Sequence, residues 1–509
     1  MARSILRLKV SSGEKSRLAV NSLVVNAATV FDKGVFFVIT VLVARYLSLE
    51  HYGEYATALS YAAFFSLFTD IGINQAMLRS LSLDRELERE HFTSAVAVKA
   101  LLSLVVYGLM ALSLSFTGYN ADTVCLTLVL GFVRVGNVYL SSFYTLFDAK
   151  GRFYYSAVLN STFSLAFLAG TAAVIVWKGD YFHIAGVRAG IVFLYLAGVA
   201  ALTFMNYSIR FDRSTLKDFI RQALPFSVIS IYSNLFQNSN VLILSFIQGT
   251  LQAGIFNNGY IFLSSLFFIP GNLNRVLLPY LYKIDRARER EKFQFAHDLY
   301  ARAYGVMAFF ISIALFLFSG DIVRQVFGAK FDGASPVLRV AALGVPFVFT
   351  VSGAVVTALD LQKKTVPWYR FAAFFNLAAC GALSYFFGAE GAAASIVITH
   401  GILFFGFQFL LHRGGHIDFN KTGFVYLKLV VIAALTVGAE GHSPGLLNLG
   451  LCPVEEVEPC HHGSEVGRSV EGDRLAVLPV AELIITGMDV APGGDGVELA
   501  HGHLDVGDD

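Results

Sequence analysis

Charged side chains are scarce in this sequence, and their scarcity excludes an ordinary soluble protein. Only 15% of the 509 residues are charged, whereas 55% are hydrophobic and the mean hydropathy is +0.61. Soluble domains carry about 25% charged residues, so this chain is predicted to be an integral membrane protein. Four cysteines in so long a chain do not make the disulfide framework of a small secreted domain.

Other absences narrow the function. The sequence has no Walker-type phosphate loop, and its histidines show no metal-ligand spacing, so neither an ATP site nor a metal is expected. No predicted loop is long enough for a catalytic domain. The N-terminal segment "MARSILRLKVSSGEKSRL" is basic and polar, unlike a cleavable signal peptide. We therefore expect no enzyme activity, no cofactor and no nucleic-acid partner.

Apolar windows of about 20 residues predict thirteen membrane-spanning helices. They lie near residues 22–45, 55–78, 94–116, 122–146, 156–177, 183–205, 223–248, 255–281, 303–319, 337–359, 367–387, 391–411 and 423–438. Lys and Arg gather in the loops on one side of these spans, whereas the opposite loops hold only Lys178, Arg324 and Lys330. By the positive-inside rule, the N-terminus is predicted to lie in the cytoplasm.

Aromatic residues are absent from residues 439–509, although the whole chain has 47 Phe, 22 Tyr and 2 Trp. This segment holds 14 acidic and 2 basic residues, against 23 acidic and 36 basic residues in 1–438. Its apolar run "LAVLPVAELIIT" is too short to span a membrane. Two interpretations stay open: an acidic tail on the outer side, or a shifted reading frame that replaces a fourteenth helix.

An internal repeat relates the two halves of the apolar region. The segment "YGEYATALSYAAFFSLFTDIGINQAMLRS" (52–80) aligns with "AGIFNNGYIFLSSLFFIPGNLNRVLLPYL" (253–281) at an offset of 201, which matches Gly53 with Gly254. Six spans lie within this offset, so the two copies point the same way across the membrane. Two such bundles facing each other are a recurrent transporter plan.

Several segments resemble a known family. The segments "ARYLSLEHYGEYATALSYAAFFSLFTDIGINQAMLR", "VFGAKFDGASPVLRVAAL" and "GAEGAAASIVIT" are similar to matching regions of bacterial polysaccharide flippases. These flippases belong to the superfamily of multidrug, oligosaccharidyl-lipid and polysaccharide (MOP) transporters, which includes the MATE extruders and the lipid II flippases. The likeness covers about residues 20–415 in the correct order.

The resemblance implies an all-α integral membrane fold of 12–14 transmembrane helices, with two pseudo-symmetric six-helix lobes around a central cavity. For this chain we expect about 13 such helices. The expected parts are a basic tail (1–21), a first lobe (22–221), a second lobe (222–412), a thirteenth span (413–438) and the atypical tail (439–509).

The resemblance also implies a task in the bacterial cytoplasmic membrane. Relatives of this kind move oligosaccharide repeat units linked to undecaprenyl diphosphate from the inner to the outer leaflet. The implied partners are this lipid-linked oligosaccharide, membrane lipids, the coupling ion H⁺ or Na⁺, and the glycosyltransferases and polymerase of the same pathway.

Cations inside the spans are the candidates for binding an anionic diphosphate, because Arg and Lys bind phosphate oxygens. Lys33 lies near mid-depth in the first span, and a polar stripe of Asn26, Thr29 and Thr40 shares its helix face. Asp32 borders this stripe, as a carboxylate that balances the cation or carries a coupling ion. The alternative is a structural ion pair with other helices. Adjacent helical residues point apart, so Asp32 and Lys33 are expected to have different partners.

Two arginines complete the set of candidate cations. Arg134 lies halfway along the fourth span, with Asn137 on its face, and Asp32 or Asp70 could pair with it. Arg275 lies in the eighth span, from which it could also reach the basic inside loop. For both, a buried structural bridge is the alternative. Arginines nearer to span ends are expected to be interfacial anchors: Arg188, Arg339 and Arg370.

Two further polar groups lie within spans. Asp70, in "LFTDIG", is expected either to couple transport to H⁺ or Na⁺ or to pair with Arg79 or with a cation of another helix. Asn240, in the polar segment "FQNSNV", is expected to hydrogen-bond either sugar or a neighbouring helix.

Two competing functions are considered. A drug or metabolite antiporter of the same fold would favour an acidic, aromatic cavity over a cationic one. A membrane enzyme of polysaccharide assembly would need a large outer loop with reactive groups, and the sequence has none.

Overall fold

The computed structural model describes residues 12–415, apart from residues 71, 84–87, 205–212, 272–280, 282–289, 352 and 360. Arg275, the predicted thirteenth span and the acidic tail lie outside the described residues. Within the described part, every regular element is a helix, and nine helical segments are long and apolar enough to cross a membrane. Large apolar side chains such as Phe116, Trp177 and Phe386 are exposed, as expected for a lipid-facing surface. The chain is a multi-pass membrane protein.

The first group of helices, here called the first lobe, comprises α1–α7. Their bounds are Ser12–Tyr46, Leu49–Ser66, Ile73–Leu83, Glu88–Leu114, Ala121–Ala149, Phe153–Val176 and Tyr181–Phe204. Helices α4–α7 have between 24 and 29 residues, enough to cross a hydrocarbon core of about 30 Å. Side-chain caps begin two helices: Ser48 accepts a hydrogen bond from the amide of His51, and Asn120 from that of Thr123.

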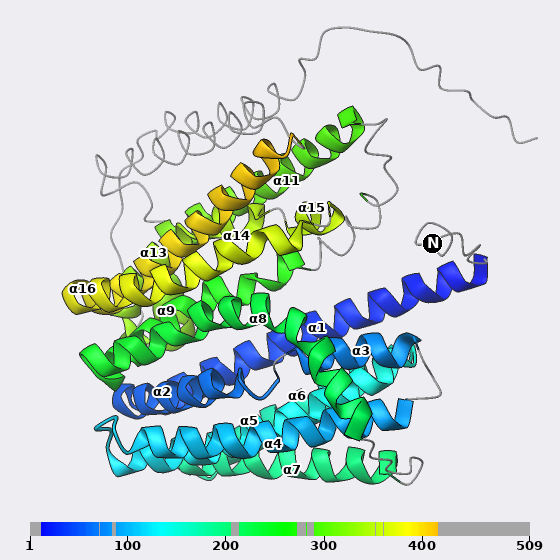
Figure 1. The fold of residues 1–509 in the computed structure, drawn as a ribbon. Helices are drawn as coiled ribbons and strands as arrows, with labels where there is room; N and C mark the ends of the chain where they lie inside the picture. The colour runs from blue at the N-terminus through cyan, green and yellow to red at the C-terminus, as the bar shows by residue number, and fades with distance from the viewer. Residues whose placement is uncertain are drawn as a thin grey trace, which may run out of the picture. The chain divides into compact units, whose positions relative to one another are not determined.

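The second group, here called the second lobe, comprises α8–α16. The bounds are Arg213–Gln248 for α8, Thr250–Leu266 for α9, Arg290–Leu317 for α11, Ser319–Phe327 for α12, Ala334–Ala342 for α13, Val345–Thr350 for α14, Gly353–Ala358 for α15 and Gln362–Arg413 for α16. A short 3₁₀ helix, η1, covers Ala329–Phe331. Helix α8 packs against α16 and α9 on one side and against α2, α3 and α4 of the first lobe on another (Figure 1).

The long helix α16 contains two of the predicted spans. Gly388, with φ of 56°, interrupts the helical conformation between them. Asn376 donates a hydrogen bond of 3.1 Å to the hydroxyl of Thr399, so the two arms pack side by side as a hairpin. A glycine tolerates this positive φ at no steric cost, which explains the sharp turn there.

Two predicted spans are broken, which corrects the sequence-based prediction of continuous helices. The span at 55–78 ends as α2 at Ser66 and restarts as α3 at Ile73, with Gly72 at φ 66° in the break. The span at 337–359 is divided into α13, α14 and α15. A hydropathy window measures apolar length and not backbone continuity, so it cannot detect such breaks.

Three helices begin ten or more residues before the predicted spans. Helix α1 begins at Ser12 rather than at 22, α8 at Arg213 rather than at 223, and α11 at Arg290 rather than at 303. All three extensions contain several charged residues, which lower the hydropathy without preventing helix formation.

Hydrophobic packing defines the two lobes and their junction. One core lies within the first lobe and includes Met77 and Phe143, whereas the core around Phe236 and Phe407 lies within the second. A further core joins the lobes, with Tyr52 of α2 and Phe331 of η1 edge to face at 5.3 Å. The loop charges predict which helix ends lie on the outer side of the membrane, and we call these the outer ends. The core that joins the lobes lies near the outer ends.

The internal repeat lies at this junction. Helices α2 and α9 pack against each other, and their matched glycines, Gly53 and Gly254, are in contact: a Cβ atom on Gly254 would lie 2.7 Å from the Cα of Gly53. Asn257 of α9 donates a hydrogen bond of 2.8 Å to the hydroxyl of Tyr52 close by. Equivalent helices that meet through equivalent residues indicate an approximate twofold relation between the lobes.

We predict that Gly254→Ala destabilises the protein, because the added methyl group has only backbone atoms to displace. The expected cost is about 1–3 kcal/mol, as for other overpacked sites, and the midpoint of thermal unfolding of the purified protein should fall by several degrees. Gly190→Ala in α7 is the matched control, since no atom lies within 4 Å of the added Cβ. Equal midpoints for the two variants would contradict the inferred close packing.

Candidate functional site

Lys33 lies on the face of α1 that meets the second lobe. Its side chain is exposed, and one helical turn further along, the ring of Phe37 packs edge to face on Phe262 of α9 at 5.8 Å. Positions four residues apart share a helix face, so the Lys33 face is directed toward the second lobe. The Thr29 hydroxyl donates to the carbonyl of Val25 in its own helix, at 2.7 Å. That hydroxyl is therefore left mainly as an acceptor.

Asp32 points away from Lys33, as the helical geometry predicts. Its side chain is buried, and one carboxylate oxygen accepts a hydrogen bond from the Asn160 amide of α6. The other oxygen, Oδ1, has no hydrogen-bond partner, and no cation of the described residues lies within ion-pair distance of either oxygen. Asn160 was not singled out from the sequence. A lone Asn in an apolar helix is the signal that could have identified it.

Arg134 of α5 and Arg188 of α7 are neighbours in the first lobe. Arg188 is close enough to repel Arg134 electrostatically, and its guanidinium lies over the ring of Phe167, 4.7 Å from the centroid. The Nε atom of each arginine is buried without a hydrogen-bond partner. No ion pair joins either to a carboxylate of the described residues, so neither Asp32 nor Asp70 is the partner of Arg134.

The prediction that Arg188 is an interfacial anchor is therefore wrong. Only 9% of this residue is exposed, because its helix packs against α5 and α6. Two neighbouring arginines with buried, unpartnered Nε atoms and no acidic partner among the described residues form a place where an anion is stabilised. Asn137, one turn beyond Arg134, is partly buried on the same helix.

Asp70 lies in the break between α2 and α3 and pairs with Lys99 of α4. The Lys99 ammonium is 3.2 Å from Asp70, and its side chain is completely buried. Of the two interpretations of Asp70, the geometry supports an ion pair with a cation of another helix. Lys99 was missed in the sequence, although a lysine within the apolar run "AVAVKALLSL" is the same kind of signal that identified Lys33.

Asn240 belongs to a separate polar cluster inside the second lobe. It is fully buried in α8, and its side-chain oxygen accepts a hydrogen bond of 3.2 Å from Ser395 of α16. Ser395 also approaches Asn376, which completes the contact between α8 and the two arms of α16. The structure thus supports the helix-to-helix interpretation of Asn240 and does not bring it to Arg134.

Two cations, one from each lobe, donate hydrogen bonds to backbone carbonyls of the opposite lobe at the outer ends. Arg45, in the last turn of α1, donates through Nε to the carbonyl of Val326 at 2.7 Å and through Nη2 to that of Gln325. Lys330, from η1, donates back to the carbonyls of Arg45, at 2.8 Å, and Leu47. The last carbonyls of a helix lack helical partners and carry partial negative charge, so each cation stabilises the end of the opposite lobe's helix. We call this set of contacts the outer clamp.

An ion pair holds the segment that carries Lys330. Arg324 lies 2.6 Å from Asp332, and this contact keeps the pKa of the Asp332 carboxyl below its ordinary value. Both side chains are exposed, so the pair orients the segment more than it stabilises the protein.

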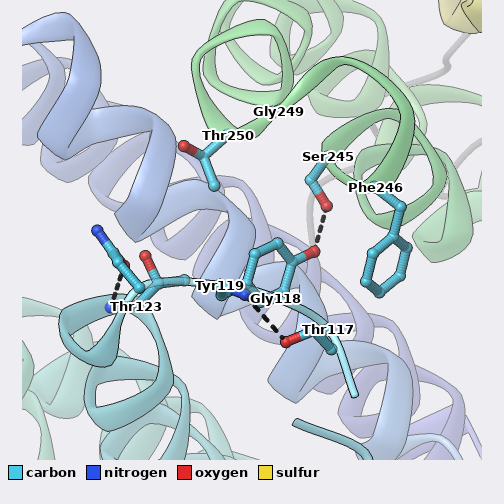
Figure 2. Close-up of a pocket in the computed structure, with 9 residues that line it drawn as sticks. Thr117, Gly118, Tyr119, Thr123, Ser245, Phe246, Gly249 and Thr250 are labelled. Carbon is cyan, nitrogen blue, oxygen red and sulfur yellow. Dashed lines mark hydrogen bonds between the residues drawn. The ribbon is translucent and has the colours of Figure 1, made fainter. Parts of the chain in front are cut away.

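The outer ends also enclose a pocket of about 360 Å³ between the lobes. Figure 2 shows Tyr119, from the loop before α5, pointing toward Ser245 of α8, with a hydrogen bond of 2.5 Å between their hydroxyls. The Tyr119 ring stacks on Phe246 at 5.4 Å. None of the candidate residues lines this pocket, so it belongs to the outer closure and not to the cationic site.

The sequence and the fold are both similar to those of known membrane proteins. The family model described as polysaccharide biosynthesis protein matches residues 18–285. None of the curated proteins matches the sequence.

Several solved transporter structures share this fold. The lipid II flippase MurJ in an inward closed conformation is similar with a TM-score of 0.65 and 16% identity, over 82% of this chain and 93% of that one. A MATE family multidrug resistance transporter of the MOP superfamily is similar in its inward-facing conformation, with a TM-score of 0.59 and 14% identity, over 78% of this chain and 98% of that one. A MATE family transporter of the MOP superfamily in an outward-facing conformation is similar with a TM-score of 0.54 and 14% identity, over 79% of this chain and 96% of that one. These likenesses show the fold.

We predict that loss of the outer clamp opens the outer side. In Arg45→Ala/Lys330→Ala, a cysteine introduced at Phe262, with the native cysteines replaced, should react about fivefold faster with a membrane-impermeant thiol reagent added outside. This is the shift expected from about 1 kcal/mol of lost hydrogen bonding. Lys178→Ala, in another outer loop, is the control. An unchanged rate in the double variant would show that the clamp does not hold the lobes together.

Proposed function

The chain belongs to the family of polysaccharide biosynthesis proteins, and on this basis we propose that it is a flippase for undecaprenyl diphosphate-linked oligosaccharide repeat units. It would carry them from the inner to the outer leaflet of the bacterial cytoplasmic membrane. The observation that carries the proposal is the pair Arg134 and Arg188, whose buried Nε atoms have no hydrogen-bond partner and which form no ion pair with a carboxylate of the described residues.

The chemistry of the cargo fits this pair. A buried charge is costly unless it is compensated, and two adjacent cations add their mutual repulsion. A diphosphate supplies two anionic groups, and the guanidinium fork binds phosphate oxygens in a bidentate way. Binding the diphosphate therefore relieves an unfavourable arrangement of the empty protein.

Lys33 and the polar groups near it complete the proposed binding surface. The exposed Lys33 ammonium on α1 offers the cargo a first, mobile contact, and Asn26 and Asn137 offer amide groups to sugar hydroxyls. Arg275, matched by the repeat to Asn74, is proposed as the cation of the second lobe. Asn240 contributes through the packing of α8 and α16, on which the second lobe depends.

Transport would then alternate between a state that is closed on the outer side and a state that is closed on the inner side. The outer clamp and the contact of Gly53 with Gly254 hold the outer ends together in this structure. The cargo would enter from the inner side in this state, and its release outside would require the hydrogen bonds of the outer clamp to break. Hydrogen bonds of the clamp face water at the membrane surface, so they can be exchanged for bonds to water at small cost.

We propose Asp32 rather than Asp70 as the carrier of the coupling ion. Asp70 already has the Lys99 ammonium as its cation, whereas Asp32 is buried with one oxygen that lacks a partner. The unpartnered oxygen of Asp32 can accept one further contact, which a coupling ion would supply. Asp32 also lies on α1 beside Lys33, so its charge acts directly on the proposed binding surface.

We predict that Arg134→Ala and Lys33→Ala abolish polysaccharide export in cells while the protein still inserts in the membrane. In vesicles, Arg134→Ala should weaken the apparent affinity for a lipid-linked repeat unit about 10–100-fold, since a hydrogen bond to a charged group contributes about 1.5–3 kcal/mol. Arg339→Ala, an exposed arginine of α13, is the matched control. Normal transport by both cavity variants, or transport of cationic drugs instead of lipid-linked sugar, would overturn the proposed function.

We further predict that Asp32→Asn separates transport from its ion gradient. Asparagine keeps an acceptor for Asn160 but cannot take up a proton or hold a cation by charge. Accumulation against a gradient of lipid-linked substrate should be lost, while exchange of substrate between equilibrated vesicles continues. Asp180→Asn, a carboxylate of an outer loop, serves as control. Gradient-driven accumulation by Asp32→Asn at the normal rate would rule out Asp32 as the carrier.

A further inference from the structure

The Lys99 ammonium lies inside a set of oxygen atoms supplied by three parts of the first lobe. It donates hydrogen bonds of 2.7 Å to the side-chain oxygen of Asn74 and to the hydroxyl of Ser142. The carboxylate of Asp70 is 3.2 Å away, and the carbonyl of Val138 is 3.4 Å away. An ammonium group has three protons to donate, and these four oxygen atoms account for all of them.

The same oxygen atoms are the kind that bind a free monovalent or divalent cation. Carboxylate, amide, hydroxyl and backbone carbonyl oxygens are the ligands of hard cations in proteins. The set also lies at a break in a membrane-spanning helix, where transporters of other folds coordinate ions with irregular backbone. In this chain the cation at that place is covalently attached through the side chain of Lys99.

The surroundings are built to hold this cation. Lys99 and Ser142 are completely buried, and the amide of Asn74 donates to Asp70 at 2.7 Å and to Ser141 at 3.0 Å, so Asn74 has its oxygen directed at the ammonium. The backbone N–H of Asn74 also donates to Asp70 at 3.2 Å, which begins α3 after the break. Removing the charge of Lys99 would leave Asp70 without its cation at the start of that helix.

We propose that the Lys99 ammonium is a tethered cation that occupies the ion site at the α2–α3 break, so that this site takes up no free Na⁺ or K⁺ in the native protein. The vacated site of a Lys99 variant accepts a small cation from solution. This inference does not rest on the identity of the transported molecule, because its test measures stability and not transport.

The test is rescue of Lys99→Ala by cations. The midpoint of thermal unfolding of the purified full chain is measured in choline chloride and, at equal ionic strength, in ammonium, methylammonium, sodium or potassium chloride. We expect the midpoint of Lys99→Ala to fall by about 5 °C or more in choline. At least one small cation should restore most of this loss, while the native protein should gain from these cations no stabilisation that depends on Asp70. Lys363→Ala, an exposed lysine, should show neither the loss nor the rescue.

A second pair of variants keeps the inference testable if Lys99→Ala does not fold. Asp70→Asn leaves the ammonium uncompensated and should also lower the midpoint, with no rescue by cations. The neutral double variant Asp70→Asn/Lys99→Met should be more stable than Asp70→Asn alone and insensitive to the cation. A native protein stabilised by Na⁺ or K⁺ in a manner that Asp70→Asn abolishes would overturn the proposal. A Lys99→Ala variant that no small cation restores would overturn it as well.

Discussion

A charge carried into the membrane interior needs an opposite charge or a full set of hydrogen bonds, because hydrocarbon offers neither. The charged groups of the first lobe meet this constraint to different degrees. Lys99 and Asp70 satisfy each other with the help of Asn74. Asp32 is satisfied at one oxygen only, and Arg134 and Arg188 are left beside each other. The groups that lack partners are those for which a ligand or an ion makes the largest difference.

The junction of the lobes depends on two glycines, whose lack of a side chain allows a close helix contact. Gly53 and Gly254 let α2 and α9 approach until their backbones touch, and this contact brings Arg45 and Lys330 within reach of the opposite helix ends. The close helix packing is therefore at the crossing of α2 and α9, whereas the polar contacts lie around this crossing at the water-exposed ends. Such an arrangement lets the polar contacts break while the helices pivot about the glycines.

The pocket at the outer ends and the cationic site serve different purposes. At the pocket, Tyr119 and Ser245 are joined by a direct hydrogen bond, and the Tyr119 ring stacks on Phe246, so these two hydroxyls are satisfied within the protein. The arginine pair has no such partners among the described residues. For the proposed function, we therefore take the unpartnered arginines, rather than the volume of this pocket, as the place where the cargo would bind.

The sequence by itself determined the membrane class, the family and the repeat that relates the lobes. It also located most of the helices of the described part of the chain, where nine helical segments are long and apolar enough to cross a membrane and two of the predicted spans are broken. These follow from apolar length, loop charge and local motifs, which do not depend on how helices pack. Sequence patterns also singled out Lys33 and Arg134 as candidate cations for binding the cargo. Only the tertiary structure decided which charged and polar groups meet. It paired Asp70 with Lys99 and placed Arg188 near Arg134. It also brought the Asn160 amide to the carboxylate of Asp32. Partners on different helices are chosen by helix rotation and by breaks such as that before α3, and a single helical pattern contains no information about either.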